Sequence, residues 1–405
     1  SLPRTAKRGL PLQAVFAAKA PETRVNPPMT TLLDYQPASG LVYHSDVKRG
    51  VSPLNIFNAR GELLQAIALK SPAVRVREDG ESLLALTMGS FSSSDAPTGK
   101  LVRIGRKNAA DSLYNSMEVL IDGLRRPVDM AWADLDGDGD EDVAIAQFGN
   151  WTGKLEWFEN EEGKYRRHLL HSGTGATQVQ AEDLNSDGLP DLLALVAQGE
   201  ETIYALLNQG NGKFSKQKLL QFPPSYGSVS FNYVDVNGDG YKDLVHASGD
   251  NADYEAIPKP YHGIRVYTGA PGLQFTESCF FPLHGAYQAE IADFDGDSDL
   301  DIAAISFFPD YATAPEESFV MLQNESTADS LAFVAFSIPE ATTGRWIVMD
   351  SGDLDNDGAT DLLLGAFVVQ NPYGAGKDVK KTWLKDSPSL LMLFNRWNMK
   401  ADRGK

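Results

Sequence analysis

The chain alternates between short apolar runs and polar turns that are rich in glycine and aspartate. Typical runs are Val143–Ala146 and Leu192–Leu195, each preceded by an acidic segment. Short apolar runs bounded by turn residues are typical of buried β-strands. Helical periodicity is nowhere sustained, and no apolar run approaches the length of a membrane span. The pattern predicts an all-β protein without a transmembrane segment.

Five of the turns repeat one acidic design of nine residues. They begin at Asp134, Asp183, Asp235, Asp293 and Asp353, separated by 49, 52, 58 and 60 residues. Oxygen-bearing side chains occupy positions 1, 3, 5 and 9 of each copy, and position 7 can offer its carbonyl. Ca²⁺ takes about six to eight oxygen ligands in a flexible shell. A lone acidic turn is ordinarily a solvated turn, but five copies in register predict about five calcium sites.

The predicted calcium ligands are Asp134, Asp136, Asp138, Asp140 and Asp142 in the first loop; Asp183, Asn185, Asp187, Leu189 and Asp191 in the second; Asp235, Asn237, Asp239, Tyr241 and Asp243 in the third; Asp293, Asp295, Asp297, Asp299 and Asp301 in the fourth; and Asp353, Asp355, Asp357, Ala359 and Asp361 in the fifth. Position 6 is glycine in four copies, which suits a sharp turn with positive φ. Ser298 replaces it in the fourth copy, so we expect that loop to be strained or weaker. An EF-hand would add a bidentate Glu at position 12 and flanking helices, and the sequence has neither.

These loops resemble the FG-GAP or VCBS repeats of bacterial exported proteins, which are similar to the calcium-loop blades of integrin α-subunit propellers. The resemblance covers roughly residues 125–397. It implies four-stranded antiparallel blades in which the calcium loop joins the innermost strand to the second. It also implies that all calcium loops lie on one face of a ring.

The first third of the chain holds two weaker copies of the same strand–turn–strand outline, at Thr31–Tyr43 and Ala73–Gly89. Five clear and two degenerate copies predict a seven-bladed β-propeller, since a period near 50 residues fits four strands a blade. We expect one domain: an N-terminal segment 1–28, two degenerate blades at 29–124, five calcium-loop blades at 125–397 and a tail at 398–405. The apolar segment Leu10–Ala17 either supplies the missing outer strand of the last blade or is a leader.

Composition agrees with exported, calcium-bound repeats. The net charge of −19 owes much to the 18 acidic loop ligands, and no basic groove for nucleic acid is present. Cys279 is the only cysteine, which is usual for a bacterial periplasmic, outer-membrane-associated or extracellular protein and unusual for a secreted animal one. The chain opens at Ser1, so we read it as a mature or trimmed form. The segment Asn150–Thr152 matches a glycosylation sequon, a frequent chance match.

Longer loops between strands two and three, and between blades, should lie on the face opposite the calcium loops. Function often resides in such loops. The predicted recognition residues there are Tyr254, Tyr261, His262, His284, Tyr287, Asp310, Tyr311, Arg345 and Trp346. The alternative for each is packing beneath the loops.

Two function classes follow. The first is a non-enzymatic binding or scaffold module for a protein or glycan, and the second is a polysaccharide lyase or sugar dehydratase. The inserts at 249–254, 259–263 and 305–311 also resemble a subgroup of exported bacterial propellers that can accompany a c-type cytochrome domain. The sequence has no Cys-x-x-Cys-His motif, so haem would belong to a partner or envelope complex. Binding is favoured, because no catalytic motif appears.

Overall fold

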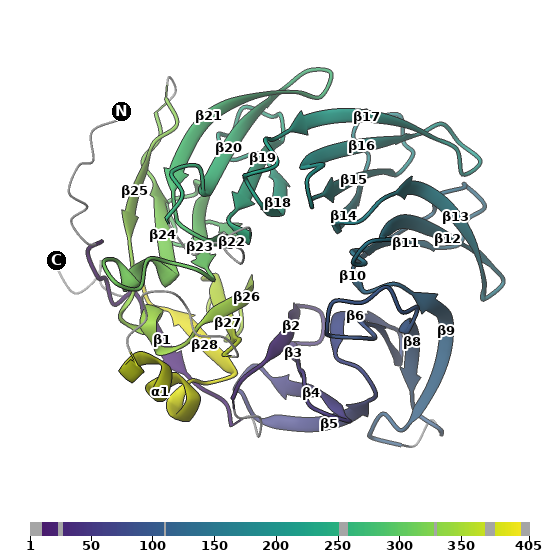
Figure 1. Cartoon of the computed structure of the whole chain (residues 1–405), viewed down its shortest axis with the longest axis horizontal. Helices are drawn as coiled ribbons and strands as arrows, with labels where there is room; N and C mark the ends of the chain where they lie inside the picture. The colour runs from purple at the N-terminus through teal and green to yellow at the C-terminus, as the bar shows by residue number, and fades with distance from the viewer. Residues whose placement is uncertain are drawn as a thin grey trace.

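The protein is a ring of seven four-stranded antiparallel sheets (Figure 1). The computed structural model describes residues 10–22, 27–108, 111–250, 258–327, 330–368 and 377–397. Each sheet is a blade, and in six of the seven blades the strands follow chain order from the centre of the ring outward. The fold is the predicted seven-bladed β-propeller.

The two N-terminal blades contain the degenerate repeats. Blade 1 consists of β2 (Thr30–Gln36), β3 (Leu41–Asp46), β4 (Ser52–Asn58) and β5 (Leu63–Leu69). Blade 2 consists of β6 (Ala73–Asp79), β7 (Ser82–Thr87), β8 (Gly99–Gly105) and β9 (Ser116–Leu124).

The other five blades carry the acidic loops between their first and second strands. Blade 3 consists of β10 (Pro127–Ala133), β11 (Asp142–Gln147), β12 (Lys154–Glu161) and β13 (Lys164–Ser172), and blade 4 of β14 (Ala176–Glu182), β15 (Asp191–Val196), β16 (Thr202–Asn208) and β17 (Phe214–Gln221). Blade 5 consists of β18 (Ser228–Val234), β19 (Asp243–Ser248), β20 (Gly263–Ala270) and β21 (Gln274–Pro282), and blade 6 of β22 (Ala286–Ala292), β23 (Asp301–Ser306), β24 (Phe319–Asn324) and β25 (Phe333–Phe336). Blade 7 consists of β26 (Trp346–Gly352), β27 (Asp361–Ala366), β28 (Leu390–Asn395) and β1 (Phe16–Lys19).

The N-terminal strand β1 closes the ring. It pairs antiparallel with β28, with Phe16 opposite Asn395 and Lys19 opposite Met392. Figure 1 shows this strand, at the purple end of the chain, beside the yellow strands of blade 7. The last two residues of the apolar segment Leu10–Ala17 belong to this strand. The segment therefore contributes to the outer strand of the last blade, as one of the two alternatives predicted. Both ends of the chain therefore hold the last blade together.

The core lies between the blades. Every residue of the second strands β11, β15, β19, β23 and β27 is buried. One cluster joins Ala144 and Leu155 of blade 3 to Val179 and Leu192 of blade 4. Each sheet thus buries its faces against its neighbours, which is why a single repeat cannot fold alone.

Side chains also link the inner strands around the axis. The Gln178 amide exchanges two hydrogen bonds, of 2.8 and 2.9 Å, with the backbone of Phe231 in the next blade. Gln288 does the same with Met349, at 2.7 and 3.0 Å. These bonds satisfy backbone groups that an inner edge strand would otherwise leave to water. They fix the register between neighbouring blades.

Within the part of the chain that the structure describes, three short helices interrupt the connections, and the sequence pattern did not predict them. They are η2 (Pro315–Ser318), η3 (Pro339–Thr343) and α1 (Lys377–Asp386). Trp383 of α1 is buried, and its Nε1 donates to the Thr342 carbonyl at 2.9 Å. That contact docks the α1 insertion onto the neighbouring blade-linking loop. Among the described residues, no helix has both the length and the apolar character to cross a membrane.

Candidate metal centres and the opposite face

Backbone N–H groups of each acidic loop donate to the carboxylates of the same loop, as described here for the first. Asp134 at position 1 accepts the backbone N–H groups of Gly137 at 2.7 Å and Gly139 at 3.1 Å. Asp136 accepts from Asp138 at 3.1 Å, and Asp138 accepts from Asp140 at 3.0 Å. The chain is thereby wrapped around its own carboxylates, so their oxygens converge on one side of the loop.

Two of these bonds recur in every copy. The position 6 N–H donates to the position 1 carboxylate at 2.8–3.1 Å in all five loops, from Gly139, Gly188, Gly240, Ser298 and Gly358. The position 7 N–H likewise donates to the position 5 carboxylate, from Asp140, Leu189, Tyr241, Asp299 and Ala359. Repetition of this geometry in five loops supports one shared ligand chemistry.

Position 9 anchors each loop to its blade. Asp142 is buried, and its two oxygens accept the N–H groups of Leu135 at 2.9 Å and Asn160 at 2.8 Å. Asp191, Asp243, Asp301 and Asp361 are buried in the same way. Burial raises the pKa of Asp142 to about 6 and that of Asp301 to about 7, because an ionised carboxylate loses solvation there. A bound cation would favour the charged form of these groups.

Three loops bring three carboxylate oxygens within 4.8 Å of one another. They are Asp134, Asp136 and Asp142; Asp293, Asp295 and Asp297; and Asp353, Asp355 and Asp357. In the second and third loops the Asn185 and Asn237 amides donate to the position 5 carboxylates at 2.9 and 3.0 Å. The donor set consists of hard oxygens, so it fits Ca²⁺ better than a soft or imidazole-seeking metal.

The backbone at position 6 explains the glycine pattern. Its φ is 98° at Gly139 and 87° at Gly358. Ser298 adopts the same left-handed conformation with φ of 80°, which an L side chain rarely takes. The strain expected in the fourth loop is therefore present.

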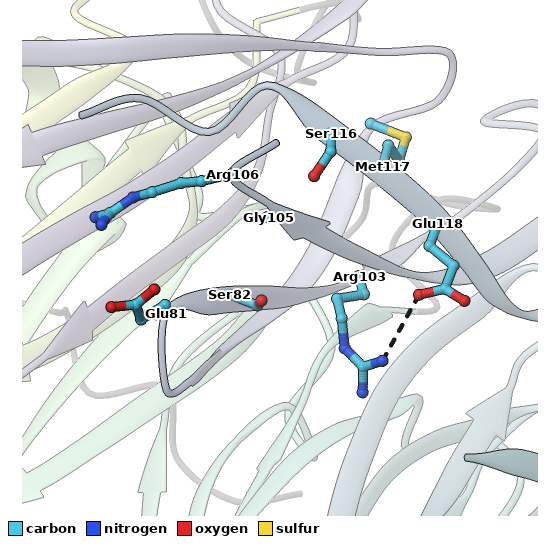
Figure 2. Close-up of a pocket in the computed structure, with 8 residues that line it drawn as sticks. All are labelled: Glu81, Ser82, Arg103, Gly105, Arg106, Ser116, Met117 and Glu118. Atoms are coloured by element: carbon cyan, nitrogen blue, oxygen red, sulfur yellow. Dashed lines mark ion pairs between the residues drawn. The ribbon is translucent and has the colours of Figure 1, made fainter. Parts of the chain in front are cut away.

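Blade 2 has lost the acidic loop and carries a polar hollow instead (Figure 2). The hollow has a volume of about 350 Å³ and is lined by Glu81, Arg103, Arg106 and Glu118, among others. Arg103 forms ion pairs of 3.7 Å with both Asp79 and Glu118. Mixed charges replace converging carboxylates there, so this blade does not offer the calcium geometry.

Five of the predicted recognition side chains lie inside the protein rather than on its surface. They are His262, His284, Tyr311, Arg345 and Trp346. The Trp346 Nε1 donates to the Ala341 carbonyl at 2.8 Å, and the Arg345 guanidinium lies 3.6 Å from the ring centroid of Phe307. For these five residues the structure shows the alternative that the sequence left open: their side chains pack beneath the inserted loops. A direct role in partner binding remains a prediction.

The remaining predicted recognition residues are less enclosed. Tyr261, Tyr287 and Asp310 are half-buried, and Tyr254 lies outside the described residues. Tyr261 stacks on Tyr226 with ring centroids 5.6 Å apart. Asp310 accepts the N–H of Ala312 at 3.1 Å and so shapes its own turn.

The opposite face presents an aromatic residue that the sequence analysis missed. Trp151 lies in the β11–β12 loop and exposes 83% of its surface. Asp95 of the β7–β8 loop accepts the N–H groups of Asn150, Trp151 and Thr152 at 2.8–3.1 Å. Four hydrogen bonds from three backbone N–H groups thus connect the tip of this loop to the neighbouring blade. A tryptophan in a turn flanked by Gly149 and Gly153 is the signal that could have identified it.

Both glycines are required by the tight loop around Trp151. A Cβ atom at Gly153 would lie 2.4 Å from the Phe148 carbonyl oxygen, and one at Gly149 would lie 2.6 Å from the Gly153 nitrogen. The β7–β8 loop also reaches the other way, since Phe91 stacks on Phe367 of blade 7 at 5.6 Å. The β7–β8 loop of blade 2 therefore contacts both blade 3 and blade 7 at the face that carries Trp151.

Comparison with known proteins gives two kinds of result. Residues 134–194 and 183–246 match the FG-GAP-like repeat family. Among curated proteins, the chain is 26% identical over 148 residues to integrin alpha-4 of Xenopus laevis and 41% identical over 78 residues to integrin alpha-PS5 of Drosophila melanogaster. These matches cover 33% and 16% of the chain but only 14% and 8% of the integrins.

Solved structures support the fold alone. A chain from a complex of S. cerevisiae Dbp5 with Nup159, Gle1, IP6 and ADP aligns with a TM-score of 0.51 at 10% identity, covering 96% of this chain and 97% of that one. A protein from Lactobacillus plantarum aligns with a TM-score of 0.50 at 12% identity, over 77% and 86% of the two chains. Identities this low carry no functional inference.

Proposed function

Because this chain is a seven-bladed β-propeller and its residues 134–246 match FG-GAP-like repeats, we propose that it is a non-enzymatic binding module. In this proposal calcium stabilises the ring, and the partner is a protein. The integrin relatives support a protein partner over a glycan. The recognition face is the one opposite the acidic loops. The observation that carries the proposal is the exposed Trp151, whose backbone N–H donates to Asp95 of the neighbouring blade.

A rigid exposed tryptophan is suited to recognition. Tryptophan is enriched among residues that dominate binding energy, and its large ring loses little conformational entropy on binding. Clamping the loop in advance reduces the ordering cost that a mobile loop would bear. An indole that is exposed to water adds little packing energy to the ring, so the stability of the fold does not explain its position.

Calcium acts as structural support in this proposal. Each of the five loops connects the innermost strand of its blade to the second strand, near the ring axis. Binding of about five ions would neutralise carboxylates that otherwise repel one another. Loops that offer short aspartate carboxylates and lack the Glu of an EF-hand suit the high free calcium outside cells, so we propose an exported protein, with a bacterial envelope as the setting.

The lyase alternative gains no support from the inserted face. His262 is buried, and burial together with nearby His284 lowers its pKa to about 3. An imidazole with so low a pKa is a poor general base near neutral pH. We therefore advance the binding function alone.

The test compares three proteins: the wild type, Trp151→Ala and Leu169→Ala. Leu169 is a matched control, since it exposes 57% of its surface on the outer strand β13. Each is used to capture extracellular and envelope proteins of the source organism and is applied to a glycan array. The proposal predicts a protein partner that is lost with Trp151→Ala and kept with Leu169→Ala. Glycan binding instead, or a protein partner unaffected by Trp151→Ala, would contradict it.

A further inference from the structure

The fifth acidic loop differs from the other four because an arginine contacts its carboxylates. Arg396 Nη2 lies 2.7 Å from Asp355 Oδ2, and Arg396 Nη1 lies 2.8 Å from Asp357 Oδ2. The side chains of all three residues are about 30% exposed. One guanidinium thus bridges positions 3 and 5 of the loop, which are two of its four carboxylate ligands.

The arginine occupies a repeated position in the blades. It follows Asn395, whose N–H donates to the position 9 carboxylate of Asp361 at 2.7 Å. The residues that follow the corresponding N–H donors in blades 3 to 6 are Glu161, Gln209, Ala270 and Glu325. Blade 7 is therefore the one acidic-loop blade with a cation at this position.

The arginine is also fixed at the point where the ring closes. Its backbone N–H donates to the Val15 carbonyl at 2.7 Å, just before β1. Its Nη1 donates to the Asn395 carbonyl at 2.8 Å. The side chain is therefore pre-positioned by the pairing of β1 with β28, and it connects that closure to the fifth loop.

We propose that Arg396 is a built-in counter-cation of the fifth loop, competing with calcium for Asp355 and Asp357. The inference rests on the proposed calcium binding. A calcium ion needs the lone pairs of these carboxylates, and it repels a guanidinium only a few ångströms away. Without calcium, the arginine relieves repulsion among the acids. When calcium binds, the arginine must move away or share the carboxylate oxygens of Asp355 and Asp357 with the ion.

A specific ranking follows from this competition. By carboxylate count, the fifth loop equals the first and the fourth. The ion pairs to Arg396 lower its calcium affinity below that of the first loop. The guanidinium and calcium exchange next to the closing strand β1. The negative charge of the fifth loop is therefore partly balanced by a cation whether or not calcium is bound.

The test substitutes Arg396→Gln, which installs the residue type of blade 4, and uses Glu325→Gln as the matched control in blade 6. Calcium occupancy of each loop is measured by anomalous diffraction from crystals equilibrated at a series of free calcium concentrations. In Arg396→Gln the fifth loop should bind about three- to tenfold more tightly, the scale expected for the loss of two partly exposed ion pairs. The other four loops, and all loops of Glu325→Gln, should keep their wild-type affinities.

Thermal melting supplies a second measurement. In EGTA, Arg396→Gln should melt below the wild type, and added calcium should raise its Tm by more than it raises the wild-type Tm. If Arg396→Gln does not fold, Arg396→Lys keeps a cation without the planar fork, and its fifth loop should also bind more tightly than in the wild type.

The outcomes separate the two claims. If the fifth-loop affinity is unchanged in the folded variant, Arg396 has no effect on calcium binding and the competition is overturned. If the affinity is weakened, Arg396 positions the carboxylates for calcium, and the competition is overturned as well. Absence of calcium from all five loops of the wild type instead overturns the proposed calcium support itself.

Discussion

The carboxylate of Asp95 accepts the backbone N–H of Trp151 through both oxygens, at 3.0 and 3.1 Å, although the two residues belong to different blades. Substitution Asp95→Ala should release the β11–β12 loop while leaving the ring folded, because the contact is exposed. Hydrogen exchange at residues 150–152 should accelerate, and partner binding should weaken toward that of Trp151→Ala. Asp111→Ala, at another exposed turn, is the control. Unchanged exchange in Asp95→Ala would show that Asp95 does not clamp the loop.

Trp346 is predicted to be a core residue. Its side chain is fully buried and its Nε1 is bonded to the Ala341 carbonyl. Trp346→Ala should reduce the free energy of unfolding by about 3–5 kcal/mol, the usual range for a buried large aromatic. Denaturant unfolding measures this directly. A loss below about 1 kcal/mol would mean that the loop above Trp346 can collapse into the space.

Calcium affinity should follow carboxylate count in the first three loops, which all have glycine at position 6. The second and third loops have Asn185 and Asn237 in place of one carboxylate, so they should release calcium at higher free concentration than the first. Asp187→Ala leaves two carboxylates and should abolish binding at the second loop in conditions where Asp138→Ala only weakens the first. Site-by-site occupancy at graded free calcium tests the order. Equal affinities would show that loop rigidity, rather than charge, controls binding.

The calcium-free protein should lose stability as pH rises from about 4 to about 7. Burial and the neighbouring Asp350 raise the pKa of Asp34 to about 7, and burial also raises the pKa of Glu290. Since the folded state holds these protons to higher pH than the unfolded state, ionisation favours unfolding across that interval. Melting in EGTA at a series of pH values measures the slope. Asp34→Asn should flatten it, and an identical slope would remove Asp34 as a cause.

The sequence predicted the features that repeat along the chain. The acidic loops recur at regular spacing, so the ring, its seven blades and the shared turn geometry followed from local pattern. Features that depend on contacts between distant segments did not follow. Whether Trp346 is exposed or packed could not be decided from the sequence, because it is buried in a cluster that includes Val15 and Phe319. Arg396 reaches carboxylates 39 and 41 positions away, and Trp151 owes its fixed exposure to Asp95, 56 positions away.

The most direct test of a calcium-supported propeller is the number and place of bound ions. Crystals grown with excess calcium should show five anomalous peaks, one inside each loop that begins at Asp134, Asp183, Asp235, Asp293 or Asp353. EGTA should remove them and lower the Tm, because an ion that binds only the folded chain stabilises it. Peaks absent from these loops, with a Tm unchanged by EGTA, would contradict the account.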